Sequence, residues 1–157
     1  MNIQEIMSKP AITCRTSDSL NTAAQLMWEH DCGVLPVVDD EGSAVGMITD
    51  RDICMAAYTQ GRTLPSIEVS QAMARQVFSC RVNDPLKVAE QLMSEKQVRR
   101  VPVVDGDNRP LGVLSLNDIA RHATVSRKKN GLDHEVTQTL AAICQPHMEH
   151  EPAEWAT

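Results

Sequence analysis

The strongest constraint on the fold of this 157-residue chain is an internal repeat with a spacing of 66 residues. When residues 4–53 are aligned with residues 70–119 without a gap, 17 of the 50 positions are identical. An ungapped repeat of this quality predicts two copies of one supersecondary unit that pack against each other. The longest identical runs are Gln25-Leu26-Met27 with Gln91-Leu92-Met93, and Pro36-Val37-Val38-Asp39 with Pro102-Val103-Val104-Asp105.

Each copy contains a junction at which an apolar strand runs into a helix. A hydroxyl followed three residues later by a carboxylate indicates a capping box, which satisfies free N–H groups at the start of the helix. The same groups also suit a nucleotide, because helix N-termini attract phosphate and a carboxylate can accept two hydrogen bonds from a vicinal diol. The residues alone leave both interpretations open. The junctions read Gly46-Met47-Ile48-Thr49-Asp50-Arg51-Asp52 and Gly112-Val113-Leu114-Ser115-Leu116-Asn117-Asp118.

The pattern of each copy predicts the element order β-α-β-β-α. The chain is therefore expected to have an α/β (α+β) fold. The turns between the paired strands are rich in Asp, Asn and Gly, as short hairpins require. A unit of about 60 residues buries too little surface to be stable alone, so we expect the two halves to share a core. The expected elements of the first copy are a strand over 11–14, a helix over 19–30, strands over 34–38 and 44–48, and a helix over 49–59. Those of the second copy include a helix from residue 85, strands over 101–104 and 111–114, and a helix over 115–126.

Individual residues set further expectations for these elements and their boundaries. Asp18 is a good N-cap for the first helix, and Pro85 suits the first helical position of its counterpart. Pro36 and Pro102 have no N–H to donate, so we expect each at a strand end or edge. The domain division that follows is a first repeat over 1–60, a linker over 61–69, a second repeat over 70–126, and an extension over 127–157.

Composition restricts the class of partner. The formal net charge of −6 and the 3% of aromatic residues argue against nucleic acid as the main partner. The apolar runs are short and no basic-then-apolar leader begins the chain, so we expect neither a membrane span nor secretion. Five cysteines without a CxxC motif do not indicate a disulfide framework. We therefore expect a reducing cytoplasm, with Cys14 and Cys80 as buried apolar residues.

The repeat order, the Pro-Val-Val-Asp strand and the two junctions resemble a pair of cystathionine-β-synthase (CBS) domains, the tandem known as a Bateman module. The resemblance covers about residues 3–123. It implies two repeats packed around a pseudo-two-fold axis, and binding of AMP, ADP, ATP or another adenosyl compound. In that family the last Asp of the junction holds ribose hydroxyls, and the Ser or Thr contacts ribose or phosphate. Carried onto this sequence, the site residues are Thr49, Asp52, Ser115 and Asp118, with Pro36 and Pro102 on the adjoining strands.

Arg99 and Arg100 make the two expected clefts unequal. In related modules a basic residue at this place reaches the phosphate of a nucleotide held by the other repeat, whereas a simple solvated pair is the alternative. The first repeat has Gly33-Val34 at the equivalent positions. The resemblance therefore implies that the cleft built on Thr49 and Asp52 binds phosphorylated ligands more strongly.

No Ser/His/Asp, Cys/His or paired-carboxylate set stands at a recognisable motif spacing, so we expect a binding module and not an enzyme. Two alternatives stay open: a ligand-independent interaction scaffold, and a catalytic module with a cryptic site. A homodimer is expected, because closed two-fold pairs are the commonest assemblies and the second helices carry apolar residues beyond what one small sheet can cover. A further protein partner is possible on the same grounds. The residues noted on these helices are Met55, Ala56, Ile119 and Ala120.

The extension departs from the family pattern. Residues 127–131 form a basic turn, residues 134–145 predict a short amphipathic helix that Pro146 stops, and 147–157 read as a flexible tail. His147, Glu149 and His150 are weak metal candidates without a rigid scaffold, so no metal site is assigned.

A helix of this length is marginal alone, so we predict that it docks on its own module or on a second copy. Deletion of residues 130–157 should then lower the melting temperature or weaken dimerisation. Calorimetry and analytical ultracentrifugation of the shortened chain measure the two effects. No change in either would mean that the segment does not stabilise the module.

Overall fold

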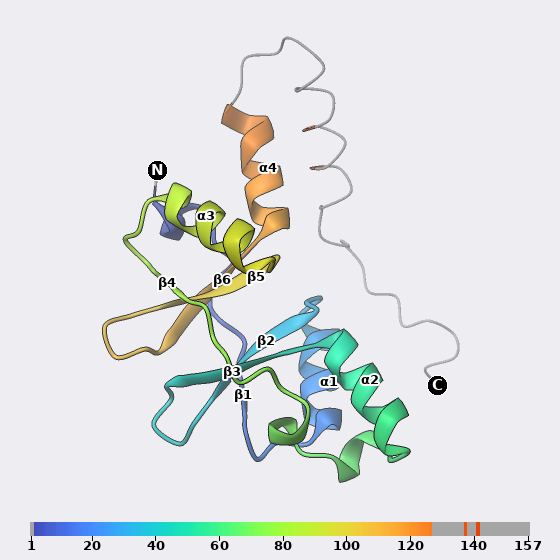
Figure 1. Cartoon of the computed structure of the whole chain (residues 1–157). Coiled ribbons are helices and arrows are strands. Elements are labelled where there is room, and N and C mark those ends of the chain that lie inside the picture. Colours follow the sequence, from blue (N-terminus) through green and yellow to red (C-terminus); the bar gives the residue numbers. More distant parts are fainter. Residues whose placement is uncertain (1, 127–136, 138–140, 142–157) are drawn as a thin grey trace.

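The computed structural model describes residues 2–126 together with Thr137 and Ala141 (Figure 1). Each repeat has the predicted β-α-β-β-α order, preceded by short 3-10 helices. The first repeat comprises η1 (Ile3–Glu5), β1 (Cys14–Arg15), α1 (Leu20–Glu29), β2 (Val34–Val38), β3 (Ala44–Thr49) and α2 (Asp50–Gln60). The second comprises η2 (Leu64–Ser66), η3 (Val69–Gln71), β4 (Cys80–Arg81), α3 (Leu86–Lys96), β5 (Arg100–Val104), β6 (Pro110–Ser115) and α4 (Leu116–Ser126).

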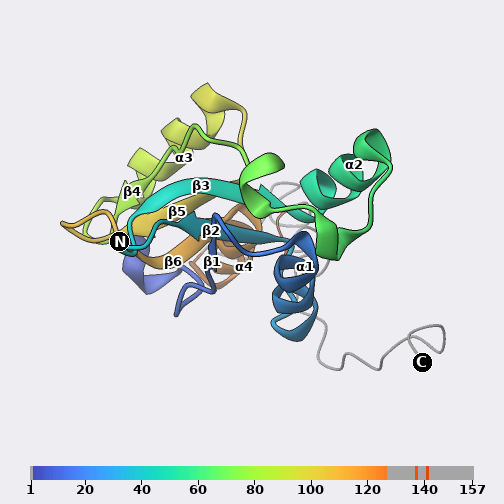
Figure 2. The ribbon, with the colours of Figure 1, turned by 90° about the horizontal axis from the view of Figure 1, so that it is seen from below.

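The two repeats form separate three-stranded sheets with the same topology, in the orders β1-β2-β3 and β4-β5-β6. In each sheet the first strand is parallel to the second, and the second is antiparallel to the third. The strands lie together at the centre of the molecule, with α1 and α2 on one side and α3 on another (Figure 2). The two hairpin turns also join, because Ala44 N donates to Asn108 O at 2.9 Å and Asn108 Nδ2 donates to Ala44 O at 3.1 Å.

The segment before each repeat packs on the other repeat. We call residues 2–8 and 68–74 the lead-in segments. Ser8 and Val113 each donate a backbone N–H to the other's carbonyl at 3.0 Å, and Met47 and Ala74 do the same at 3.0 and 2.9 Å. Ser8 and Ala74 are equivalent positions 66 residues apart, and so are Met47 and Val113. The same backbone exchange therefore occurs once in each direction between the repeats. Figure 1 shows the N-terminal end of the chain beside α3 of the second repeat.

This exchange explains the glycine that opens each junction motif. A Cβ on Gly46 would lie 2.9 Å from Ala74 O and 2.7 Å from Met73 Sδ. A Cβ on Gly112 would lie only 2.6 Å from Ser8 O. Only a residue without a side chain lets the lead-in backbone approach the strand this closely.

Two hydrophobic cores result, rather than the single shared core that the sequence suggested. Ile3 is fully buried in the core of the second repeat, and Ile67 and Val69 are fully buried in the core of the first. Each core is therefore completed by the lead-in segment of the other repeat. The two repeats still depend on each other, as their small size predicts, because neither repeat can bury its apolar face without the other.

Some predicted boundaries are corrected by local contacts. The cap of α1 is Ser19, whose hydroxyl accepts from Thr22 N at 3.2 Å, and not Asp18. Asp18 instead closes the preceding turn by accepting from Arg15 N at 2.8 Å. Pro85 is the N-cap of α3 and not its first helical residue. β1 is shorter than predicted because residues 8 and 11 pair with the second sheet.

The expectation that Pro36 and Pro102 lie at a strand end or edge is wrong. Both lie in the interior of the central strands β2 and β5. Met47, which faces Pro36, directs its N–H and carbonyl to the lead-in segment, so the proline nitrogen points away from β3. The proline nitrogen therefore faces β1. Because β1 pairs only with Val37 and Val38, the two residues after Pro36, no hydrogen bond between these strands needs an N–H at Pro36. Pro102 stands opposite Val113 in the same way.

The predicted burial of Cys14 and Cys80 is confirmed, since each is 2% exposed. Burial raises the pKa of the Cys14 thiol to about 12 and that of Cys80 to about 11. No helix in the described part of the chain is long and apolar enough to cross a membrane. Most of the predicted C-terminal helix lies outside the described residues; within it, Ala141 is buried.

The close approach at the junction glycines predicts a large effect of a single methyl group. Gly112→Ala should lower the free energy of unfolding by about 1–3 kcal/mol, because backbone must move to admit the Cβ. Gly106→Ala is the matched control, since a Cβ there meets nothing within 4 Å. It should be neutral or slightly stabilising. Urea titration of both variants tests the exchange, and equal stabilities would contradict it.

Candidate functional site

Both junctions form the predicted capping boxes. Thr49 N donates to Asp52 Oδ2 at 2.9 Å, and Asp52 N donates to Thr49 Oγ1 at 3.1 Å. In the second repeat Ser115 N donates to Asp118 Oδ2 at 2.8 Å, and Asp118 N donates to Ser115 Oγ at 3.2 Å. Each carboxylate is thereby fixed at the positive end of its helix.

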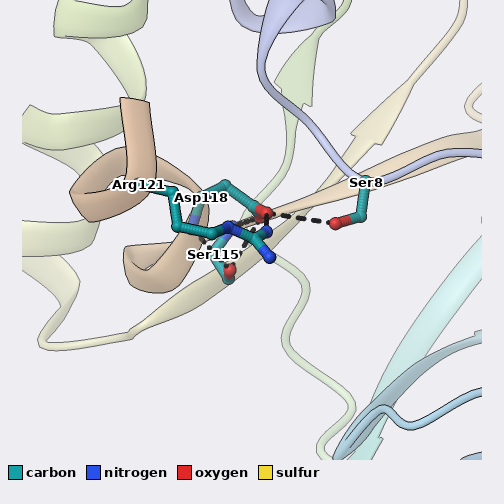
Figure 3. A network of polar contacts seen from close by, with 4 residues as sticks. All are labelled: Ser8, Ser115, Asp118 and Arg121. Carbon is teal, nitrogen blue, oxygen red and sulfur yellow. Dashed lines mark hydrogen bonds and ion pairs between the residues drawn. The ribbon is translucent and has the colours of Figure 1, made fainter. Parts of the chain in front are cut away.

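Asp118 has two further partners, one from the far end of the chain and one from its own helix (Figure 3). The Ser8 hydroxyl, in a lead-in segment, donates to Asp118 Oδ1 at 3.1 Å. The Arg121 guanidinium, one turn along α4, forms an ion pair with the same oxygen. The side chain of Asp118 is only 2% exposed, whereas that of Arg121 is 29% exposed. A buried carboxylate thus has a counter-ion that still reaches solvent.

The equivalent carboxylate in the first repeat has neither extra partner. Ala74 replaces Ser8 and has no hydroxyl, and Met55 replaces Arg121 and has no charge. Asp52 is accordingly only half-buried. The two repeats share a backbone frame, but the Asp118 side is chemically distinct from the Asp52 side.

A cavity of about 870 Å³ opens beside Asp118. It lies between the repeats: Ser115, Asp118 and Arg121 line it from the second, and residues 8–12 and 31–34 line it from the first. The volume falls within the range of about 300–1,000 Å³ that is typical of small-ligand sites. The start of α4 and its buried carboxylate therefore line a partly open cavity of ligand size.

The predicted site residues are distributed unevenly around this cavity. Arg100 lines it together with Ser115 and Asp118, whereas Thr49, Asp52, Arg99, Pro36 and Pro102 are not among its lining residues. Arg99 is exposed, and its carbonyl accepts from Leu116 N at 2.9 Å. The sequence analysis directed Arg100 to the Asp52 cleft; in this structure Arg100 lines the cavity that also contains Asp50 of the first repeat and Asp118 of the second.

Gly33 leaves room for Asp50 beside Arg100. A Cβ on Gly33 would lie 2.9 Å from Asp50 Oδ2, which is too close, whereas its distance of 3.6 Å from Arg100 Nη2 is an ordinary contact. A carboxylate and a cation therefore lie together on the first-repeat wall. Burial raises the pKa of the neighbouring Cys32 thiol, although the charge of Arg100 partly opposes that shift.

The cavity is lined by both cations and carboxylates, which lie next to each other at two places, Arg121 with Asp118 and Arg100 with Asp50. Lys9, Arg100 and Arg121 provide the positive groups, and Asp31, Asp50 and Asp118 provide the negative ones. Such a site can bind a ligand with hydroxyl donors at one end and an anionic group at the other. Sequence analysis missed Ser8 and Arg121. The available signal was the difference between the repeats at these positions, where Ala74 and Met55 stand in the other copy.

Metal chemistry gains no support from the described residues, where no group of three or more His, Cys, Asp or Glu side chains is placed to hold a metal ion. The weak candidates His147, Glu149 and His150 lie outside the described part of the chain.

Comparisons with known proteins agree with the repeat. The CBS domain family profile matches residues 3–58 and 69–124. The CBS domain-containing protein YhcV of Bacillus subtilis is 36% identical over 119 residues, which span 76% of this chain and 83% of the relative. Hypoxic response protein 1 of Mycobacterium tuberculosis is 33% identical over 144 residues, which span 91% of this chain and 94% of the relative.

Solved structures give the same answer. The CBS domain pair of protein MJ0100, crystallised with 5′-methylthioadenosine and S-adenosyl-L-methionine, superposes with a TM-score of 0.72 at 31% identity. The superposition covers 81% of this chain and 98% of that one. Repeat, topology and relatives coincide, and the chain belongs to the CBS-domain family as a protein with two CBS domains.

Proposed function

We propose that this chain is a regulatory module that binds an adenine nucleotide, or another adenosyl compound, in the cavity beside Asp118. The observation that carries the proposal is a buried carboxylate at a helix N-terminus that opens onto a cavity of ligand size. Binding, and not turnover, is the proposed activity. The adenosyl ligands bound by the CBS domain pair of protein MJ0100 support this class of ligand.

We assign complementary roles to the residues that line the cavity. Asp118 is the acceptor for the ribose hydroxyls, and Ser115 and the positive end of α4 bind the ribose or phosphate. Arg100, from the start of β5, lines the cavity and is the proposed contact to a phosphate. We therefore assign the stronger site for phosphorylated ligands to the Asp118 cavity, and no longer to the Asp52 cleft.

A regulatory role also requires two states that the ligand distinguishes, because binding shifts an equilibrium only by its differential affinity. We propose that the second state differs in the packing of a homodimer, or in its choice of a protein partner. Apolar side chains on α2 and α4 support an interface: Tyr58 is 79% exposed, Leu116 49% and Met55 45%. Ala56 and Ala120, which the sequence analysis had counted toward this surface, are buried in the module itself.

The ligand site predicts unequal effects of two matched substitutions. Asp118→Asn keeps an acceptor in the capping box but removes the charge that accepts the diol, so AMP affinity should fall about tenfold or more. Asp52→Asn makes the same change in the other repeat and should cost less. Isothermal titration calorimetry measures both. A larger loss in Asp52→Asn would place the ligand in the first-repeat cleft.

Thermal stability separates this function from a ligand-independent scaffold. An adenosyl ligand at about 100 times its dissociation constant should add roughly 2.7 kcal/mol to the free energy of unfolding. A panel of AMP, ADP, ATP and S-adenosylmethionine, with GMP as the control for the base, identifies the ligand. Indifference of the melting temperature to every compound would favour the scaffold.

The proposed dimer interface predicts that a charge introduced on α2 weakens association, whereas a charge introduced on α3 does not. Tyr58→Glu should shift the protein to a monomer at micromolar concentration, because a buried unpaired carboxylate opposes association. Val88→Glu is the control, since Val88 is 46% exposed on α3, away from the proposed interface. Sedimentation velocity distinguishes the two. A wild-type monomer, or equal weakening by both substitutions, would contradict the interface on α2 and α4.

A further inference from the structure

The carboxylate assigned to the ribose is already fully occupied. Asp118 Oδ2 accepts from Ser115 N and from Ser115 Oγ at 2.7 Å, as part of the capping box. Asp118 Oδ1 accepts from Ser8 Oγ and from the Arg121 guanidinium (Figure 3). A ligand can therefore reach Asp118 only by replacing a partner at Oδ1, because the other oxygen holds the start of α4.

The two partners at Oδ1 differ in what their removal costs. Ser8 is neutral, and a ribose hydroxyl replaces it with a like donor. Arg121 is the counter-ion of a side chain that is 2% exposed, and two neutral hydroxyls in its place would leave a buried charge uncompensated. A neutral nucleoside offers the displaced guanidinium no new anion, so it has less to offset this cost than a nucleotide has.

We propose that Arg121 is a ligand-displaced counter-ion, which makes the cavity select nucleosides that carry an anionic group as well as a vicinal diol. This inference rests on the proposed function and names the ligand class of the same site. In the ligand-free chain the guanidinium neutralises Asp118. In the complex the guanidinium turns away from Asp118 to pair with the phosphate, with Arg100 as a second cation lining the cavity, and ribose hydroxyls donate to Asp118 in its place.

The position of Arg121 permits this change. Arg121 lies three residues after Asp118 on one face of α4, and both side chains line the cavity. Its side chain is 29% exposed, so a new rotamer does not require repacking of a core. A planar guanidinium binds carboxylate and phosphate through the same fork of donors, which makes the exchange of one anion for another chemically direct.

The internal repeat supplies the matched variant. Met55 is the residue equivalent to Arg121, so Arg121→Met installs the side chain that the same scaffold already carries in the first repeat. Arg51→Met, on the exposed side of α2, makes the same change in charge and is not a lining residue. Should Arg121→Met fail to fold by circular dichroism, Arg121→Gln removes the charge but still donates to Asp118, and it carries the same expectation.

The readout is specific to this cavity. Cys32 lines it, whereas Cys54 is exposed on α2 and does not, so protection of Cys32 from alkylation reports occupancy and Cys54 is the internal reference. Peptide mass spectrometry of the full chain, titrated with AMP or with adenosine, gives both dissociation constants. Wild type and Arg51→Met should prefer AMP by about ten- to a hundredfold, the range of a charge-assisted hydrogen bond.

Arg121→Met should reduce that preference at least tenfold, by weakening AMP while adenosine binds as well as before or better. A merely structural role of Arg121 would weaken both ligands by the same factor, and that result, or an unchanged preference, overturns the inference alone. Failure of both ligands to protect Cys32 in the wild type overturns the proposed function and the counter-ion role together.

Discussion

Backbone pairing between each lead-in segment and the opposite sheet is the interaction on which the rest of this structure depends. Ser8 with Val113, and Ala74 with Met47, extend each sheet with a piece of chain that belongs to the other repeat. The pairing places Ile3 in the second core and requires a glycine where the backbones meet. A single repeat would lack part of its core and a neighbour for its third strand, so the two repeats are stable only as a pair.

The same pairing makes the two junctions differ in their side-chain contacts, although the backbones of the two repeats are equivalent. Because the lead-in segments are exchanged, the hydroxyl of Ser8 arrives at the carboxylate of the other repeat, 110 residues along the chain. With Arg121 it makes Asp118 a buried, charge-paired group that lines a cavity, in addition to its capping role. Asp52 forms the same capping box without these two partners, since Ala74 and Met55 offer neither donor. Two repeats with one backbone thus place their equivalent carboxylates in different surroundings.

Sequence reasoning succeeded where the determining interactions are local. Capping boxes depend on residues three apart, so the contacts of Thr49 and Asp52 could be predicted from spacing alone. It failed where the deciding partner is distant in sequence. The interior position of Pro36 depends on Met47 turning its polar groups to a lead-in segment, and the burial of Asp118 depends in part on Ser8, 110 residues away. Neither relation has a periodicity or spacing from which it could be predicted.

The architecture also limits how a bound ligand could be sensed. Any ligand that donates a hydrogen bond to Asp118 Oδ1 competes with Ser8. The backbone N–H and carbonyl of Ser8 are both hydrogen-bonded to Val113. The lead-in segment continues into β1 of the first repeat, so the Ser8 contact lies on the covalent path between the two sheets. Loss of one hydroxyl contact changes the energy of that path by about 0.5–1.5 kcal/mol. A change of charge at a helix end is worth about 0.3–1 kcal/mol, and up to about 2 kcal/mol where the group is partly buried. The proposed displacement of Arg121 would therefore couple the cavity to the surface by two routes of similar size, and the second acts on α4, the helix that carries the exposed Leu116.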